Sequence, residues 1–138
     1  MTIHEFAIKH RLKVRQDKDD GTDIIQGKPG FSHIYEYSED ELGVMYVSYA
    51  TVHDPARPRL WNSHSRKALA AGMTLRQNGD AEGAFSFDPG NPVQAKLAIR
   101  IAGVKAKRQV SPEQRARTAK MLAAARQRRQ DAPAGTVL

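Results

Sequence analysis

The sequence predicts an α+β fold: a small, mainly antiparallel β-sheet, one or two packed helices, and a basic C-terminal helix extending from this body. Short alternating apolar and polar segments, separated by turn signals, recur through residues 6–87. Two helix starts with proline in the first turn follow, at Asn91-Pro92 and Ser111-Pro112. We expect a compact domain over residues 1–104 and a basic linker, helix and frayed tail over residues 105–138.

The net charge of +7 is distributed unevenly along the 138 residues. Residues 92–130 hold eleven of the 22 Lys and Arg residues and one acid, Glu113. The residues before this run carry eleven Lys and Arg against thirteen Asp and Glu, so they are slightly acidic. Segregated positive charge of this size predicts a polyanionic partner, of which nucleic acid is the commonest.

The composition also argues against membrane-spanning, secreted and cysteine-dependent proteins. No apolar run approaches the roughly 20 residues that a membrane-spanning helix needs. The first residues show no apolar segment of the kind found in secretory signals. The absence of Cys excludes disulfides, thiolate zinc sites and Cys nucleophiles. We therefore expect a cytoplasmic protein without membrane contact.

The first expected element is a strand over residues 6–15. Apolar and polar residues alternate there with a period of two, which predicts one buried face and one basic face. The basic face has two interpretations: a solvated edge that blocks aggregation, or a surface that meets a polyanion. Its members are Lys9, Arg11, Lys13 and Arg15.

Two following turns resemble ligand-binding loops and fail the test of spacing. In residues 17–23, a calcium loop starting at Asp17 would need Gly at its sixth position, where Thr22 stands, and Glu at its twelfth, where Lys28 stands. For a phosphate loop ending at Gly27, five residues rather than four separate Gly21 from Gly27, and Pro29 occupies the place of the metal-binding Ser or Thr. We expect neither a metal nor a cofactor.

Residues 31–37 and 42–51 predict the clearest hairpin, because both are rich in aromatic and β-branched residues. The first of these segments has an aromatic row with two interpretations. The rings either stack on nucleic-acid bases or pair across strands and fill the core. The row consists of Phe31, His33, Tyr35 and Tyr37.

A proline-containing loop over residues 53–59 precedes an expected helix over residues 63–71. Its expected core contacts are Ala68, Leu69 and Trp61, and Gly72 ends it. A second hairpin joins residues 73–77 to residues 84–87 through Asn78-Gly79, with a bulge expected at Gly83.

Asn91 is expected to cap a helix over residues 92–102 that Gly103 ends. Its apolar stripe, predicted to pack on the sheet, consists of Val93, Leu97, Ile101 and Val104. Lys96 and Arg100 lie four residues apart and therefore share its exposed face, as part of a secondary basic surface with the residues of the 6–15 strand.

The last expected helix starts at the Ser111 cap and continues to about Arg129, because its residues are strong helix formers. A narrow apolar stripe lies between two basic flanks, and it consists of Ala116, Ala119, Leu122 and Ala123. We predict that the linker and this helix bind nucleic acid through Lys105, Lys107, Arg108, Arg115, Arg117, Lys120, Arg126, Arg128 and Arg129.

No catalytic constellation is found in the sequence, so we do not expect an enzyme. The His residues form no HExxH or other i, i+4 ligand pair, and no G-x-S-x-G elbow is present. A weak alternative is a surface dyad drawn from His33, His53, Asp54 and His64.

Two function classes follow. The first is a nucleic-acid-binding accessory protein that contacts the DNA or RNA backbone through the basic helix, mostly without reading sequence. The second is an adaptor or inhibitor that binds an acidic protein surface with the same helix. Salt dependence separates the two, because counterion release makes nucleic-acid affinity fall steeply with salt.

Overall fold

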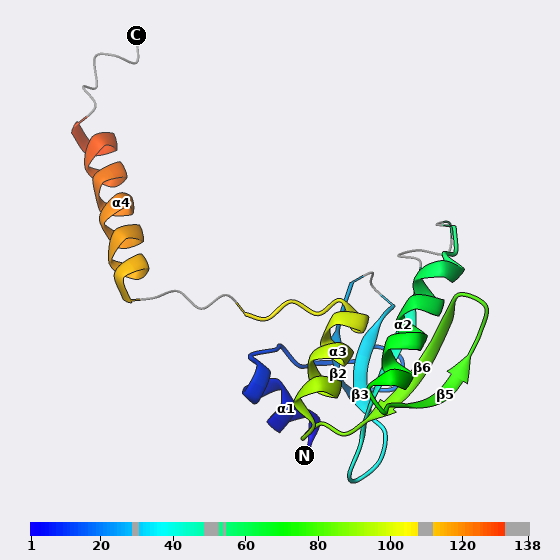
Figure 1. The fold of residues 1–138 in the computed structure, drawn as a ribbon. Helices are drawn as coiled ribbons and strands as arrows, with labels where there is room; N and C mark the ends of the chain where they lie inside the picture. The colour runs from blue at the N-terminus through cyan, green and yellow to red at the C-terminus, as the bar shows by residue number, and fades with distance from the viewer. Residues whose placement is uncertain (29–30, 49–52, 54, 108–111, 132–138) are drawn as a thin grey trace. The chain divides into compact units, whose positions relative to one another are not determined.

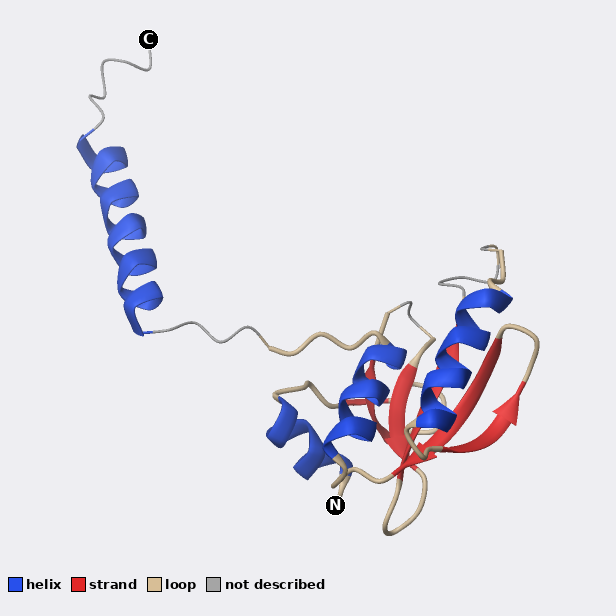
Figure 2. Cartoon of the chain, in the orientation of Figure 1, coloured by secondary structure: helices blue, strands red, loops and turns tan. Residues whose placement is uncertain are grey.

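The computed structural model describes residues 1–28, 31–48, 53, 55–107 and 112–131 (Figure 1). It has an α+β fold with six antiparallel strands and four helices, which confirms the predicted class (Figure 2). The chain forms two compact units, Met1–Lys107 and Arg108–Leu138. The first unit holds the whole sheet and three of the helices.

The sheet has the order β1-β2-β3-β4-β6-β5, and all its neighbouring strands are antiparallel. The first four strands form a meander. The chain then passes through α2 (Pro58–Ala70) and returns along the edge as β5, so that β6 pairs with β4. The strand bounds are Arg15–Gln16 for β1, Asp23–Gln26 for β2, His33–Glu36 for β3, Leu42–Val47 for β4, Thr74–Asn78 for β5 and Glu82–Phe87 for β6.

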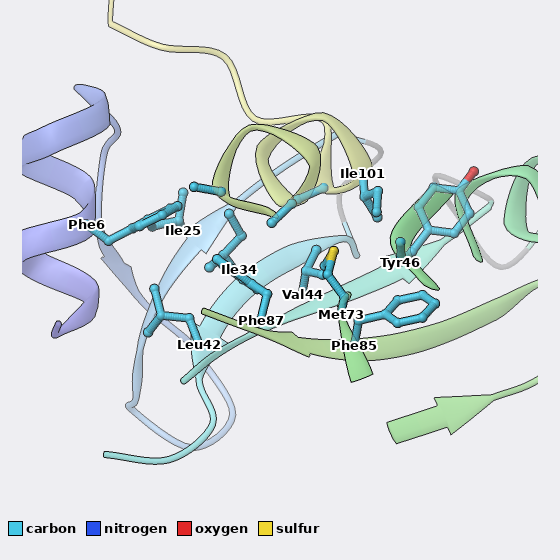
Figure 3. Close-up of a cluster of buried hydrophobic side chains, with 14 of the residues drawn as sticks. Phe6, Ile25, Ile34, Leu42, Val44, Tyr46, Met73, Phe85, Phe87 and Ile101 are labelled. Carbon is cyan, nitrogen blue, oxygen red and sulfur yellow. The ribbon is translucent and has the colours of Figure 1, made fainter. Parts of the chain in front are cut away.

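The core lies between one face of this sheet and the helices α1 (Ile3–His10), α2 and α3 (Pro92–Ala102). The strand register places Ile25, Ile34, Val44 and Phe85 in one row across β2, β3, β4 and β6. All four side chains are fully buried, and burial of each contributes roughly 1.5–3 kcal/mol. Figure 3 shows part of this cluster, with strand and helix residues in contact.

The strand predicted over residues 6–15 is wrong, because residues 3–10 form α1. Thr2 and Glu5 make a capping box, in which the Thr2 hydroxyl accepts a hydrogen bond from the Glu5 N–H at 3.1 Å. Ile3 and Phe6 are buried on one helical face, whereas Ile8, which alternation would bury, is 80% exposed. The alternation of apolar and polar residues therefore did not reflect a strand, because residues 3–10 bury one face of a helix.

The predicted ladder of positive charge is lost with that strand. Lys9 lies in the last turn of α1, and Arg11 ends the helix in the left-handed conformation at φ 57°. Lys13 follows in irregular chain, and only Arg15 belongs to a strand, the two-residue β1.

The structure also corrects the start of α2, which begins at Pro58 rather than at residue 63. Proline is favoured in the first helical turn, where its missing N–H has no partner to lose. Trp61 therefore lies within the helix and is 1% exposed, together with the buried Ala68. Leu69, expected in the core, is 52% exposed.

Both predicted hairpins are present within the described residues. The β5–β6 turn is closed by the Gly79 N–H, which donates to the Glu82 carbonyl at 2.7 Å. The expected bulge at Gly83 is wrong, because the register shifts between Leu75 and Gln77 on the partner strand. Of the predicted 42–51 strand, β4 ends at Val47, and residues 49–52 lie outside the described part of the chain.

Helix α3 has the predicted bounds and caps. The Asn91 side chain accepts hydrogen bonds from two backbone N–H groups, and Gly103 ends the helix at φ 68°. The predicted packing stripe is wrong at Val93, which is 64% exposed. The buried face consists instead mainly of small side chains, which allow the helix close to the sheet: Ala95, Ala98, Ile101 and Ala102, with Gln94 beside them.

Candidate functional site

The last helix, α4 (Pro112–Asp131), carries most of the predicted nucleic-acid-binding residues. Its 20 residues make it ~30 Å long. Every side chain from Glu113 to Arg129 is exposed. The predicted cap Ser111 and the predicted phosphate ligand Arg108 lie outside the described residues. The helix displays six cations, Arg115, Arg117, Lys120, Arg126, Arg128 and Arg129.

Helical geometry divides these cations into two flanks. At about 100° per residue, Arg117, Lys120 and Arg128 lie on one side. Arg115, Arg126 and Arg129 lie on the other side. The stripe between them is small and apolar, and its members are Ala116, Ala119 and Ala123. Leu122, predicted to belong to this stripe, lies instead on the flank of Arg115, Arg126 and Arg129.

The basic linker up to Lys107 belongs to the first compact unit. The Lys107 N–H donates to the carbonyl of Arg11 at 2.7 Å, and the Lys28 N–H donates to the carbonyl of Gly103 at 3.2 Å. These bonds hold the linker backbone while the side chains of Lys105 and Lys107 remain exposed. The structure thus brings Arg11 beside the linker, although the two are far apart in the sequence.

The six residues of the predicted secondary basic surface are contributed by several segments of the first compact unit. Lys9 and Lys96 both act on His10, whose pKa is lowered first by burial and then by these two charges. Arg15 instead lines a cavity of about 330 Å³ together with Asp17 and Asp19. The remaining members, Lys13 and Arg100, are exposed.

The aromatic row lies on the sheet face opposite the core. His33 and Tyr35 flank the buried Ile34, and their ring centroids are 5.6 Å apart. The expectation that these rings fill the core is therefore wrong. His33 and Tyr35 line a cavity of about 660 Å³ whose wall also includes Asp17, Asp20, Asp23 and Glu36. Four carboxylates repel phosphate, which disfavours this face as a nucleic-acid platform.

Sequence reasoning overlooked Arg76 on β5, which organises the neighbouring part of this face. Its Nε donates to the Ser86 hydroxyl at 2.8 Å, and its guanidinium lies 4.7 Å from the centre of the Tyr37 ring. Its Nη2 is 3.7 Å from a carboxylate oxygen of Glu41. The strand register that joins these residues had no signal in the sequence around Arg76.

The alternative of a surface dyad lies partly outside the described residues. His64 lies edge-on to the Tyr46 ring, at 4.6 Å between centroids, and its buried Nδ1 has no hydrogen-bond partner among them. His53 is exposed, whereas Asp54 lies outside the described part of the chain. The described residues also contain no group of three or more His, Asp or Glu side chains suited to a metal ion.

The lowered pKa values of His64 and His10 predict that the folded protein loses stability in acid. Burial, with Lys67 as the second cause, lowers the pKa of His64 below 6.5, and His10 shifts in the same direction. The folded protein then binds fewer protons than the unfolded chain, so stability is complete above about pH 6.5 and falls below it. Urea unfolding at about pH 7.5 and pH 5.5 should show this drop. His64→Phe should reduce the drop, whereas Leu69→Gln, a substitution at an exposed position of the same helix, should leave it unchanged; an equal drop in both variants would contradict this role of His64.

No helix in the described ranges is long and apolar enough to cross a membrane. Comparison with protein-family models, with curated proteins and with solved structures finds no match to this chain.

Proposed function

We propose that this protein binds DNA or RNA through phosphate contacts from α4, mostly without reading the base sequence. The observation that supports this most directly is the exposure of all six α4 cations on two flanks of one helix. Two basic flanks can reach phosphates on both sides of a groove. Such contacts position a protein on nucleic acid but carry no sequence information.

The linker adds to the same proposal. Lys105 and Lys107 are exposed at the point where the chain leaves the first compact unit, and Lys107 is tied to Arg11 through the backbone. Arg108 completes the proposed set, and its contribution rests on the sequence alone. Because the linker backbone is hydrogen-bonded to the first compact unit, Lys105 and Lys107 would contact phosphates independently of α4.

A salt titration tests the proposal. If all six α4 cations neutralise phosphates of a duplex, they should contribute about −5 to the slope of the logarithm of affinity against the logarithm of salt concentration. This contribution alone would weaken binding roughly 10³-fold for a fourfold rise in salt, and the linker contacts would add to it. Fluorescence anisotropy with short single- and double-stranded DNA and RNA oligonucleotides of several sequences gives both the slope and the sequence preference.

A full-length variant isolates the contribution of the helix. In this neutral-helix variant the six α4 cations become glutamine, itself a good helix former. Its salt slope should fall to about that of the linker contacts, with unchanged thermal unfolding. The control variant carries Arg59→Gln and Arg66→Gln on α2 and should bind as the natural chain does. Equal binding by the neutral-helix variant and the natural chain would refute the role of α4.

A second candidate is an acidic protein surface bound by the same helix. The exposure of Met121 at 71% and of Leu122 at 55% favours it, because apolar side chains stabilise a protein interface more than a phosphate contact. A shallow salt slope toward all oligonucleotides would favour this candidate over nucleic acid.

A further inference from the structure

A groove lies between α2 and α3 within the first compact unit. It has a volume of about 520 Å³. Its apolar lining residues are Ala70 and Ala71 from the end of α2 and Val93 and Leu97 from α3. Its remaining lining residues are the cations Lys67, Lys96 and Arg100.

A hydrogen-bonded bridge joins the two helices that line the groove. The Gln94 side-chain amide donates to the Ala71 carbonyl at 3.0 Å, and its oxygen accepts from the Asp88 N–H at 2.8 Å. Gln94 is itself buried, so these bonds are shielded from water. The bridge ties the C-terminal end of α2 to the first turn of α3. A preformed groove binds a ligand without first paying for its own ordering.

All the charged residues that line the groove are cations. Lys67 stands on α2, and Lys96 and Arg100 stand one turn apart on α3, so cations border the apolar floor from both helices. No carboxylate lines the groove, and the described ion pairs of the chain involve other residues. Val93, at 64% exposure, leaves an apolar side chain in water beside them.

We propose that this groove binds an acidic amphipathic helix of a partner protein. Apolar side chains of that helix would cover Val93 and Leu97, and its Asp and Glu residues would face Lys67, Lys96 and Arg100. Helix α4 is unsuited as the occupant, because its own charge is positive. Nucleic acid fits less well, because a charged phosphate backbone would lie against the apolar side chains of Val93 and Leu97. The inference concerns a different surface from the proposed function and stands apart from it.

The test uses a fluorescein-labelled model helix of Glu, Ala and Leu, with leucines at i, i+3, i+4 and i+7 on one face. The protein is the full-length neutral-helix variant, which removes competing attraction by α4. Three comparison ligands are used: the same composition scrambled, the same helix with Lys in place of Glu, and a single-stranded DNA oligonucleotide. Anisotropy at low salt gives each affinity.

Two variants probe the groove. The triple charge reversal Lys67→Glu, Lys96→Glu and Arg100→Glu should weaken binding of the acidic helix at least about tenfold. Val93→Asp places a carboxylate on the apolar lining and should weaken it by about fivefold or more. Val93 is exposed, so this variant should keep its thermal unfolding. The matched controls Arg59→Glu and Leu69→Asp, exposed on α2 outside the groove lining, should change affinity less than about twofold.

Tight binding of the acidic helix, lost in both groove variants and kept in both controls, supports the proposal. Unchanged affinity after the triple reversal overturns it, as does equal binding of the scrambled or Lys-substituted peptide. Loss after the triple reversal but not after Val93→Asp, together with stronger binding of the oligonucleotide, would mark the cations as a phosphate surface and also overturn it.

Discussion

Gly27→Ala is expected to destabilise the first compact unit by on the order of 3–5 kcal/mol, enough to unfold a marginally stable domain. An added methyl group would overlap the backbone carbonyl of Ala102 and come within 3.2 Å of the Ser32 carbonyl oxygen. Both obstacles are backbone atoms, which cannot rotate away as a side chain can. The Gly27 N–H already donates to the Ser32 carbonyl at 2.8 Å, so the segment after β2 cannot shift without breaking this bond.

Urea unfolding followed by far-UV circular dichroism measures this effect. The control is Gly21→Ala, where φ is 72° and nothing lies within 4 Å of the added methyl group. That variant carries backbone strain without a clash and should cost about 1 kcal/mol. A cost for Gly27→Ala no larger than for Gly21→Ala would show that the end of β2 does not pack tightly against the end of α3.

Trp61→Ala should cost about 3–5 kcal/mol. The side chain is 1% exposed, its ring lies parallel to Tyr46 and tilted against Phe85, and its indole N–H donates to the Asn78 side-chain oxygen at 2.9 Å. Removing it opens a large cavity and leaves Asn78 without this donor. The contact to Asn78 also joins α2 to the β5–β6 hairpin.

Far-UV circular dichroism reports this unfolding too, because the variant lacks the only Trp of the chain. Leu60→Ala is the matched control, since this neighbour on the same helix is 43% exposed and should cost less than about 1 kcal/mol. Similar costs for the two variants would contradict the inward orientation of Trp61.

Elements whose signals lie within a few residues were predictable. Asn78-Gly79 marked the second hairpin, and Asn91 with Pro92 marked the start of α3, because turns and caps are stabilised by bonds between near neighbours. Errors arose where two local patterns competed. The alternation over residues 6–15 masked the Thr2–Glu5 capping box, and Pro58 was interpreted as loop rather than as a first helical turn.

The two proposed binding surfaces also differ in whether the sequence could predict them. The basic helix was predictable from composition, since strong helix formers and segregated charge are properties of the sequence itself. The α2–α3 groove was not. Its existence depends on the rotation of α3, which buries Ala95 and Ala98 and leaves Val93 outside, and a periodic stripe alone could not choose between these faces.

The amino-acid sequence therefore sufficed for the α+β class, both hairpins and the charged C-terminal helix. The strand order, the covered sheet face and the contact of Gly27 with Ala102 required the folded chain. The physical reason is the range of the forces involved. Caps, turns and charge act between neighbours in sequence, whereas burial and close packing are decided between segments that meet only on folding.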